Sequence, residues 1–217
     1  GSLAQADLSG AFFAMTQKSP EQLEGQKLVQ RLLQESAAIT EETQAYKYGN
    51  FNPILVMSVI DAIVPGGAKA FIKSEILDPL NISNYKWDTH LSGLPQAGYR
   101  VSLTSRDMLK LGNIVINQGK WQGKQFVSPT YLTKATSNII KPTEDWMPDE
   151  YRYGYYWYSM PVVVEGKTYD LNVAWGGGGN RVIVVEELDL VIAITGHDRE
   201  DTIMKQISDV VIPAFVS

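Results

Sequence analysis

A run of four glycines interrupts a stretch that otherwise has the composition of a β-strand. The stretch extends from Val173 to Val185, and Gly176–Gly179 lie in its middle. Glycine inside a strand loses side-chain packing and costs conformational entropy, so such a run is best explained where something approaches the backbone closely. We therefore expect a ligand or another chain segment against these glycines. A β-bulge or a bend in the sheet is the alternative, because interior glycines commonly mark both.

The rest of the chain predicts an α+β fold. Capping residues followed by apolar stripes predict helices over residues 19–33, 52–63, 68–77 and 104–116, and a further helix that begins at Ser128. From Tyr151 the pattern changes to strands, at 153–160, 162–164, 168–174, 180–185 and 190–195, before a terminal helix over 203–215. This order predicts one domain over residues 1–217, with a helical lobe at about 19–150 and an antiparallel sheet plus terminal helix at 151–217.

Composition excludes several classes of function. The 217 residues are 44% hydrophobic, enough for a core, and the net charge of -5 contains no long basic run that would bind nucleic acid. No apolar run reaches the roughly 18 residues of a membrane-spanning helix, so we expect no membrane insertion. The absence of cysteine excludes disulfides and a cysteine nucleophile. No residue spacing typical of metal ligands is present, and we expect neither a metal nor a cofactor.

A second candidate piece is the tripeptide Tyr48-Gly49-Asn50. A tyrosine whose pKa is lowered by a nearby lysine can act as the base that takes a proton from a serine hydroxyl. Tyr48 is the candidate base, and Asn50 is the candidate contact for a substrate amide or for the lysine. Alternatively, Asn50 only stabilises its own loop. A backbone N–H near Gly177 is the candidate donor to an oxyanion, with Gly176–Gly178 forming a strand that faces the substrate.

An ordered series of short motifs carries a family resemblance. After Tyr48-Gly49-Asn50, the series continues through Asp78–Ile82, Ser102–Gly112, Asn117–Gly123, Tyr153–Trp157 and Ala174–Asn180. In this order they resemble the Tyr-x-Asn, Pro-Leu-Gly, Asp-Leu-x-x-Leu-Gly, Gly-x-Trp-x-Gly, Tyr-Gly-x-x-Trp and Ala-x-Gly-x-Gly-Gly-Gln segments of one family. That family comprises the class C β-lactamases, serine esterases and penicillin-binding hydrolases. The resemblance covers nearly the whole chain from Tyr48 onward.

The resemblance implies an acyl-enzyme mechanism in which the nucleophile is the serine of a Ser-x-x-Lys motif. In the family this motif lies well before the Tyr-x-Asn loop, but no Ser-x-x-Lys precedes Tyr48. Ser83-Asn84-Tyr85-Lys86 fits the spelling only after Tyr48, and we interpret it as a coincidence. The chain therefore resembles the C-terminal two-thirds of a β-lactamase-like fold, with the N-terminal part missing. The resemblance also implies a periplasmic or secreted location.

The third motif of the family is altered. Where the lactamases have Lys-Thr-Gly, this chain has Ala174-Trp175-Gly176, which removes the cation that pairs with a β-lactam carboxylate. The better prediction is an ester, an amide or a peptide-like substrate, with Trp157 and Trp175 as apolar walls of the site. A histidine-based triad would need His90 or His197, and both lie in polar stretches where a solvated role is expected.

Two hypotheses follow from these observations. The first is a fragment of a β-lactamase-related serine hydrolase that acts on a small-molecule or peptide-like substrate and is inactive alone, because the nucleophile is absent. The second is a non-catalytic binding or partner module that keeps the fold. Removing strands and a central helix leaves an unpaired edge, so a complementing N-terminal segment or a homo-oligomer is also expected.

Overall fold

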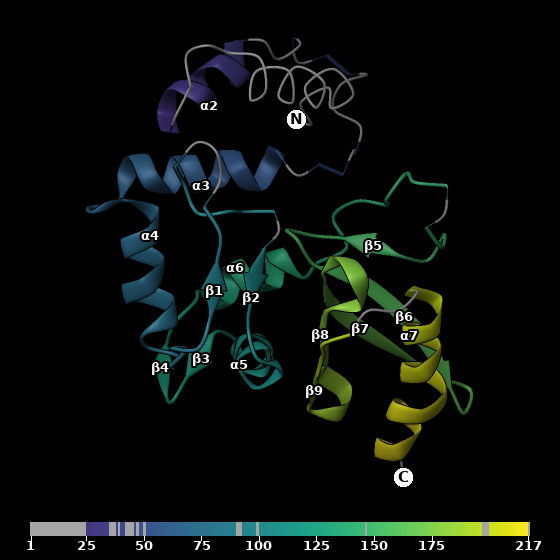
Figure 1. Cartoon of the computed structure of the whole chain (residues 1–217). Coiled ribbons are helices and arrows are strands. Elements are labelled where there is room, and N and C mark those ends of the chain that lie inside the picture. The colour runs from purple at the N-terminus through teal and green to yellow at the C-terminus, as the bar shows by residue number, and fades with distance from the viewer. Residues whose placement is uncertain are drawn as a thin grey trace. The chain divides into compact units, whose positions relative to one another are not determined.

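The computed structural model describes residues 25–34, 38, 40–41, 46, 48–49, 51–89, 93–98, 100–145, 147–196 and 200–216. The chain divides into two compact units, residues 1–102 and 103–217 (Figure 1). The division lies well before residue 150, where the sequence pattern changes, because the helix over 105–116 packs on the sheet of the second unit.

Unit 1 is mainly helical. Its elements are α2 (Gly25–Gln34), α3 (Phe51–Ile63), α4 (Gly67–Ile72), the π-helical continuation η2 (Lys73–Leu77), β1 (Lys86–Trp87) and β2 (Val101–Ser102). The predicted helices over 52–63 and 68–77 are confirmed, and the first predicted helix is described only from Gly25 onward. Gly66 and Gly67 both have positive φ, and they turn the chain between α3 and α4. The carboxylate of Asp61 accepts a hydrogen bond from the Ala68 N–H at 2.9 Å, which fixes the start of α4.

Unit 2 begins with two capped helices, α5 (Ser105–Ile116) and α6 (Pro129–Ala135). The Thr104 hydroxyl accepts a hydrogen bond from the Asp107 N–H, and the Ser128 hydroxyl accepts one from the Tyr131 N–H, so both predicted helix starts are confirmed. Between the helices lies a short hairpin made of β3 (Lys120–Trp121) and β4 (Lys124–Gln125).

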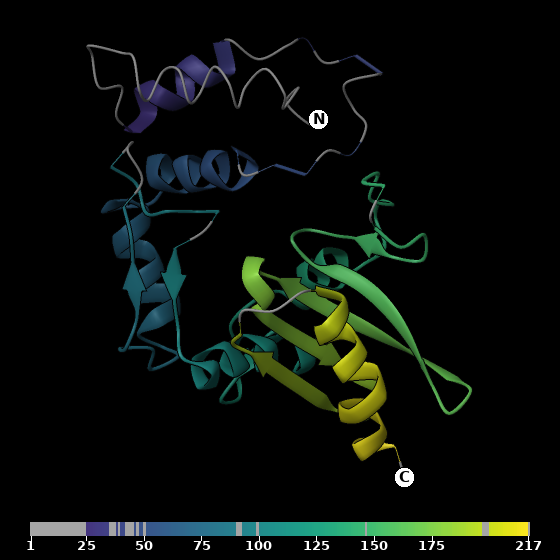
Figure 2. The same cartoon turned by 45° about the vertical axis from the view of Figure 1, so that its right-hand side comes forward.

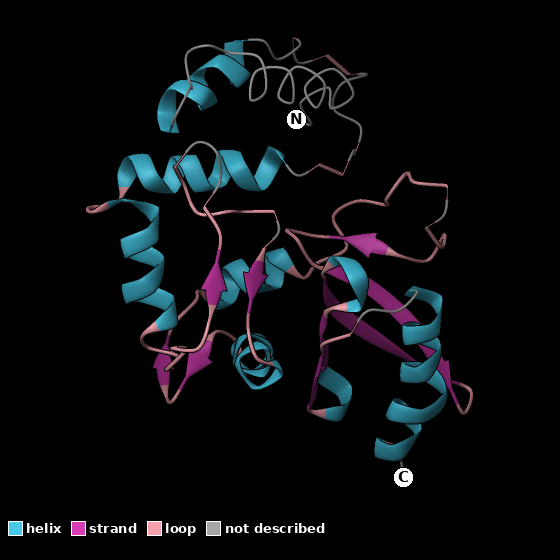
Figure 3. Cartoon of the chain, in the orientation of Figure 1, coloured by secondary structure: helices cyan, strands magenta, loops and turns pink. Residues whose placement is uncertain are grey.

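Five antiparallel strands form the sheet of unit 2, in the order β5-β6-β7-β8-β9. Figure 3 draws the strands as magenta arrows. The strands are β5 (Arg152–Tyr153), β6 (Tyr158–Val164), β7 (Lys167–Trp175), β8 (Arg181–Val185) and β9 (Leu190–Ile194). The terminal helical segment follows as α7 (Glu200–Gln206), η5 (Ile207–Val211) and η6 (Ile212–Phe215). The α+β fold with an antiparallel sheet is therefore confirmed.

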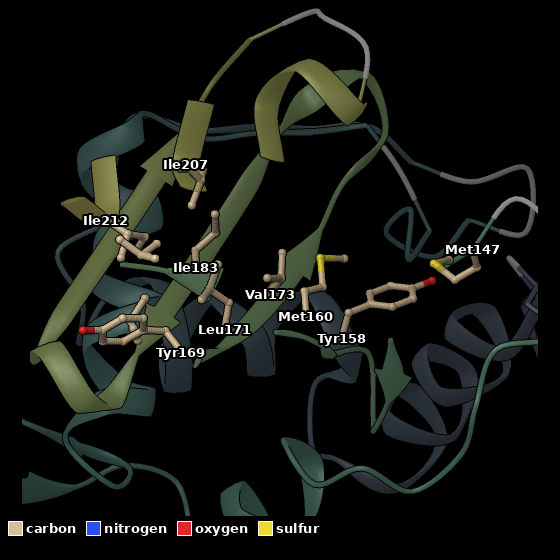
Figure 4. Packing of buried hydrophobic residues seen from close by; sticks show 11 residues of the cluster. Met147, Tyr158, Met160, Tyr169, Leu171, Val173, Ile183, Ile207 and Ile212 are labelled. Atoms are coloured by element: carbon tan, nitrogen blue, oxygen red, sulfur yellow. The ribbon is translucent and has the colours of Figure 1, made fainter. Parts of the chain in front are cut away.

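Two layers of helix cover this sheet. The terminal helical segment lies along one face (Figure 2), where Ile207 and Ile212 pack against sheet residues such as Leu171, Val173 and Ile183 (Figure 4). All five of these side chains are buried. Helix α5 packs on β8 and β9. The sheet is thereby held between two apolar layers, which fixes the hairpin from β7 to β8.

One strand prediction is corrected. Residues 153–160 do not form one strand, because the chain bends between β5 and β6. A Cβ at Gly154 would lie 2.0 Å from the carbonyl oxygen of Ala135, and Tyr156 has φ of 65°. Close contact with α6 therefore requires a glycine and a bend here. Conversely, β6 runs without a break through Pro161, which joins the two stretches predicted as separate strands.

Candidate functional site

The four glycines form the turn of the hairpin between β7 and β8. Trp175 and Arg181 are the last paired residues, and Gly177–Gly179 make a single 3₁₀ turn between them. The prediction that Gly176–Gly178 form a strand is therefore wrong, whereas their contact with a substrate stays a prediction. Gly178 has φ of 73° and Gly179 has φ of 98°, and a backbone in this left-handed region leaves the ladder of a sheet.

The glycines of this turn are not all explained by the same structural constraint. At Gly178 and Gly179 the positive φ alone favours glycine. Gly177 has no positive φ, and an added Cβ would meet nothing within 4 Å. Gly177 is also exposed, so neither its conformation nor its neighbours within the fold explain the missing side chain. The close approach of a ligand to the backbone at Gly177 stays a prediction.

A buried arginine holds the turn. Arg181 is fully buried, and its Nη1 donates hydrogen bonds of 3.1 Å to the carbonyls of Gly176 and Asn180. Its guanidinium carbon lies 4.5 Å from the centroid of the Trp175 ring, a cation–π distance. Asn180 adds a hydrogen bond from its Nδ2 to the Gly177 carbonyl, at 3.0 Å. Trp175 at the end of β7 and Arg181 at the start of β8 thus contact each other beside the turn.

Sequence analysis missed Arg181. An arginine is normally an exposed residue, so its charge gave no reason to place it inside the molecule. The available signal was its position directly before four consecutive apolar β-branched residues, Val182–Val185, all of which are buried. A strand buried on both faces leaves no solvated side for a charged residue in its first position.

The two candidate tryptophans pack in different hydrophobic clusters. Trp175 contacts Tyr158 edge-on, with ring centroids 5.2 Å apart, on the side of the terminal helix. Trp157 packs against Val115 and Leu132, on the side of α5 and α6. This packing does not support one apolar wall made of both rings. Trp175 is the one that adjoins the glycine turn.

Tyr48 lies in the loop that precedes α3, and its side chain is 49% exposed. Asn50, His90 and His197 lie outside the described residues. Tyr48 belongs to unit 1 and the glycine turn belongs to unit 2. A common site for the two stays a prediction.

No protein-family model and no curated protein matches the sequence, whereas solved structures match the fold. A Bacillus anthracis protein assigned as a 6-aminohexanoate-dimer hydrolase matches with a TM-score of 0.67 and 16% identity, over 86% of this chain and 48% of its own. An octameric penicillin-binding protein homologue from Pyrococcus abyssi matches with a TM-score of 0.65 and 15% identity, over 98% and 53%. A penicillin-binding protein from Bacillus halodurans matches with a TM-score of 0.59 and 14% identity, over 90% and 66%.

The chain has part of the β-lactamase and penicillin-binding-protein fold. It spans about half the length of the first two of these structures, 48% and 53%. The predicted resemblance to this fold, with a part of it missing, is confirmed. At identities of 14–16% the comparisons establish the β-lactamase-like fold alone.

The Ser83-x-x-Lys86 sequence lacks the geometry of the β-lactamase-like nucleophile motif. Residues three apart face each other on a helix, but Ser83 follows a turn and Lys86 begins β1. The Lys86 side chain is 81% exposed, and its ammonium lies 3.9 Å from a carboxylate oxygen of Asp88. This lysine is therefore not placed to activate Ser83.

The described residues also bear on metal binding and membrane insertion. They contain no group of three or more His, Cys, Asp or Glu residues that could hold a metal ion. None of their helices alone has the length and apolar composition to cross a membrane. Only Asn52–Ile63 and Gly67–Leu77 pass that test as a pair, with a 90° bend between them.

Proposed function

We propose that this chain is part of a serine hydrolase with the β-lactamase-like fold, whose nucleophilic serine is supplied by residues outside the chain. Tyr48 is the base, Asn50 is the polar contact for substrate or lysine, and the turn at Gly176–Gly178 borders the substrate. The observation that carries the proposal is the glycine turn, which Arg181 holds from both strands while Gly177 stays exposed and open. Bringing Tyr48 and this turn to one cleft is part of the proposal.

The proposed reaction is acyl transfer in two steps. A serine Oγ attacks the substrate carbonyl carbon, its proton passes to the Tyr48 phenolate, and a backbone N–H at Gly177 donates to the oxyanion. The phenol then returns the proton to the leaving group as the acyl-enzyme forms. In the second step water attacks the acyl carbon and the same tyrosine takes its proton. The bond between the acyl carbon and the serine Oγ then breaks, and the tyrosine returns the proton to the Oγ as the acid product leaves. A lysine one helical turn from the serine would keep the phenol pKa low enough for this role.

The proposed substrate is an ester, an amide or a peptide-like molecule. Ala174 and Trp175 stand where the lactamases carry the first residues of Lys-Thr-Gly, so no cation comes from this position. Trp175 instead packs against Arg181 and Tyr158 beside the turn. An aromatic ring at this place favours an apolar group next to the scissile bond over a carboxylate.

Labelling with a fluorophosphonate tests the proposal. The chain of residues 1–217 should take up no label, whereas the longer protein should be labelled on a serine outside these residues. Tyr48→Phe should slow labelling of the longer protein by about 10²–10⁴-fold, the usual contribution of a general base. Tyr131→Phe is the matched control, since Tyr131 is 52% exposed and lies in unit 2, and it should label at the normal rate. Stoichiometric labelling of the chain alone would refute the proposal.

A non-catalytic partner module is the second candidate. An intact fold in a longer protein that has no Ser-x-x-Lys motif and takes up no label would favour it.

Because one structural neighbour is an octamer, we also propose that the protein self-associates, which light scattering measures directly. A periplasmic or secreted location is proposed from the family resemblance alone.

A further inference from the structure

Unit 1 contains a cavity that the proposed hydrolase chemistry does not use. Its volume is about 470 Å³, within the roughly 300–1,000 Å³ of typical small-molecule sites. The α4–η2 helix and the segment that contains β1 lie side by side (Figure 1), and residues of both line the cavity. Neither Tyr48 nor the glycine turn lines it. A ligand here would therefore occupy a separate site.

One wall of the cavity comes from a single face of the α4–η2 helix. Lys69, Lys73 and Leu77 line the cavity and follow one another at intervals of four residues. This spacing places their side chains on the same side of a helix. The two lysines thus form the charged part of this wall, and the buried Leu77 forms its apolar part.

The facing wall comes from one side of an extended segment. Tyr85, Trp87 and Thr89 line the cavity, whereas Lys86 does not. Alternate residues of an extended chain point to the same side, which explains this selection. The Trp87 indole N–H donates a 2.6 Å hydrogen bond to the Gln96 carbonyl, so the larger aromatic ring is held in place. Two aromatic side chains therefore face the lysine wall.

Both carboxylates at the cavity already have cationic partners. Lys73 Nζ lies 2.6 and 2.7 Å from the two carboxylate oxygens of Asp78. Asp88 lies 3.5 Å from Arg100 and 3.9 Å from Lys86. The lining thus holds two lysines and two carboxylates, and Asp88 is paired with cations that lie outside the lining.

Lys69 is the lining lysine whose charge is left for a ligand, because Lys73 pairs with Asp78 and Asp88 pairs with Lys86 and Arg100. It is exposed, and among the residues that the structure describes it has no ion-pair partner. A ligand that contacts this side chain displaces no described ion pair. An anionic group of a ligand is the complement of this charge, and an apolar or aromatic body is the complement of Tyr85 and Trp87.

We propose that this cavity binds a small organic carboxylate with an aromatic or alkyl body. The carboxylate contacts Lys69, and the body packs between Leu77 and the rings of Tyr85 and Trp87. This site is independent of the proposed serine chemistry, and binding requires no nucleophile. The ligand therefore binds this chain whether or not the longer protein is a hydrolase.

The test uses 4-phenylbutyrate as the probe and 4-phenylbutylamine as its charge-reversed control. Titration of the isotopically labelled chain, followed by NMR, should give saturable shifts for residues of the α4–η2 helix and of β1 with phenylbutyrate. The expected Kd is on the order of 1 mM or below, as for a ligand of this size. The amine should bind at least tenfold more weakly. Equal binding of the two probes, or shifts elsewhere in the chain only, would overturn the proposal.

Two variants locate the contacts. Lys69→Glu should weaken phenylbutyrate binding at least about tenfold, because it replaces attraction by repulsion. Lys124→Glu makes the same charge change at an exposed residue of unit 2 and should leave binding unchanged. Tyr85→Ala should weaken both probes, because it removes an aromatic wall from each. Unchanged binding by Lys69→Glu would refute the assigned contact, since this exposed substitution leaves the fold intact.

Discussion

The guanidinium of Arg181 stacks on the ring of Trp175, 4.5 Å from its centroid, and donates from the same Nη1 to the carbonyls of Gly176 and Asn180. One buried cation therefore holds both ends of the turn that joins β7 to β8. A glycine-rich turn is conformationally permissive by itself. The arginine adds to the hydrogen bond of Asn180 in ordering this turn.

Replacing Arg181 by methionine should destabilise unit 2 by about 2–4 kcal/mol, because two carbonyls lose the charged donor that a buried side chain supplies. Arg181→Lys should recover only part of this loss, since an ammonium lacks the planar guanidinium that stacks on Trp175. Urea unfolding measures both variants. Arg100→Gln is the control, because its ion pair is exposed and its loss should change stability by no more than about 0.5 kcal/mol.

Alanine at two neighbouring glycines should change the stability of the protein by different amounts. Gly178 has φ of 73°, so Gly178→Ala should cost about 1–2 kcal/mol in stability. Gly177→Ala should be close to neutral, because its Cβ would meet nothing within 4 Å. In the longer protein, however, Gly177→Ala should slow fluorophosphonate labelling if a ligand lies against this backbone. Wild-type labelling by Gly177→Ala would contradict the assigned approach.

Gly112→Ala should destabilise the protein even though alanine is the better helix former. An added Cβ would lie 2.4 Å from Val191 Cγ1 and 2.9 Å from Val182 Cγ1, which are stiff branched side chains. The overpacking of about 1–3 kcal/mol should exceed the gain in helix propensity of about 1 kcal/mol. Thermal unfolding measures the effect, and Gly196→Ala, whose Cβ meets nothing within 4 Å, is the control for an added methyl group without a close contact. A raised Tm for Gly112→Ala would contradict this packing.

Stability should fall in acid partly through Asp107. The Lys110 ammonium, 2.7 Å away, and then the Thr104 hydroxyl hold the pKa of this carboxyl below its ordinary value of 3.8. The unfolded chain binds the proton more readily, so the ion pair stabilises above about pH 4 and this contribution is lost as pH falls through the lowered pKa. Asp107→Asn should be less stable than wild type at pH 7, and the difference should shrink below pH 4. A constant difference would contradict the assignment.

Local signals predicted the capped helices and the paired strands. Thr104 and Ser128 cap their helices through contacts within three residues, so the sequence contains all the information needed. The strands predicted at 180–185 and 190–195 are likewise apolar runs close together in sequence, and the turn at Glu186–Leu188 joins them as β8 and β9. The β1–β2 and β3–β4 pairs were missed, because strands of two residues are too short to show a period.

The site was harder to predict because its geometry depends on contacts distant in sequence or on buried charge. Four glycines are compatible with a strand, a bulge or a turn, and the backbone at Gly178 and Gly179 decides for the turn. The bend at Gly154 results from its contact with the Ala135 carbonyl on α6. The role of Arg181 requires knowing that its strand is covered on both faces.

A distance between residue 48 and residue 177 tests most directly whether Tyr48 and the glycine turn border one cleft. The chain has no cysteine, so Tyr48→Cys with Gly177→Cys accepts two spin labels and no others. Gly177→Cys paired with Val163→Cys, within unit 2, calibrates the labels. Walls of one small-molecule cleft predict a single narrow distance distribution at about 20 Å or less, in this chain and in the longer protein. A distribution centred beyond about 35 Å in both would place the phenol and the turn at separate sites and contradict the proposed hydrolase site.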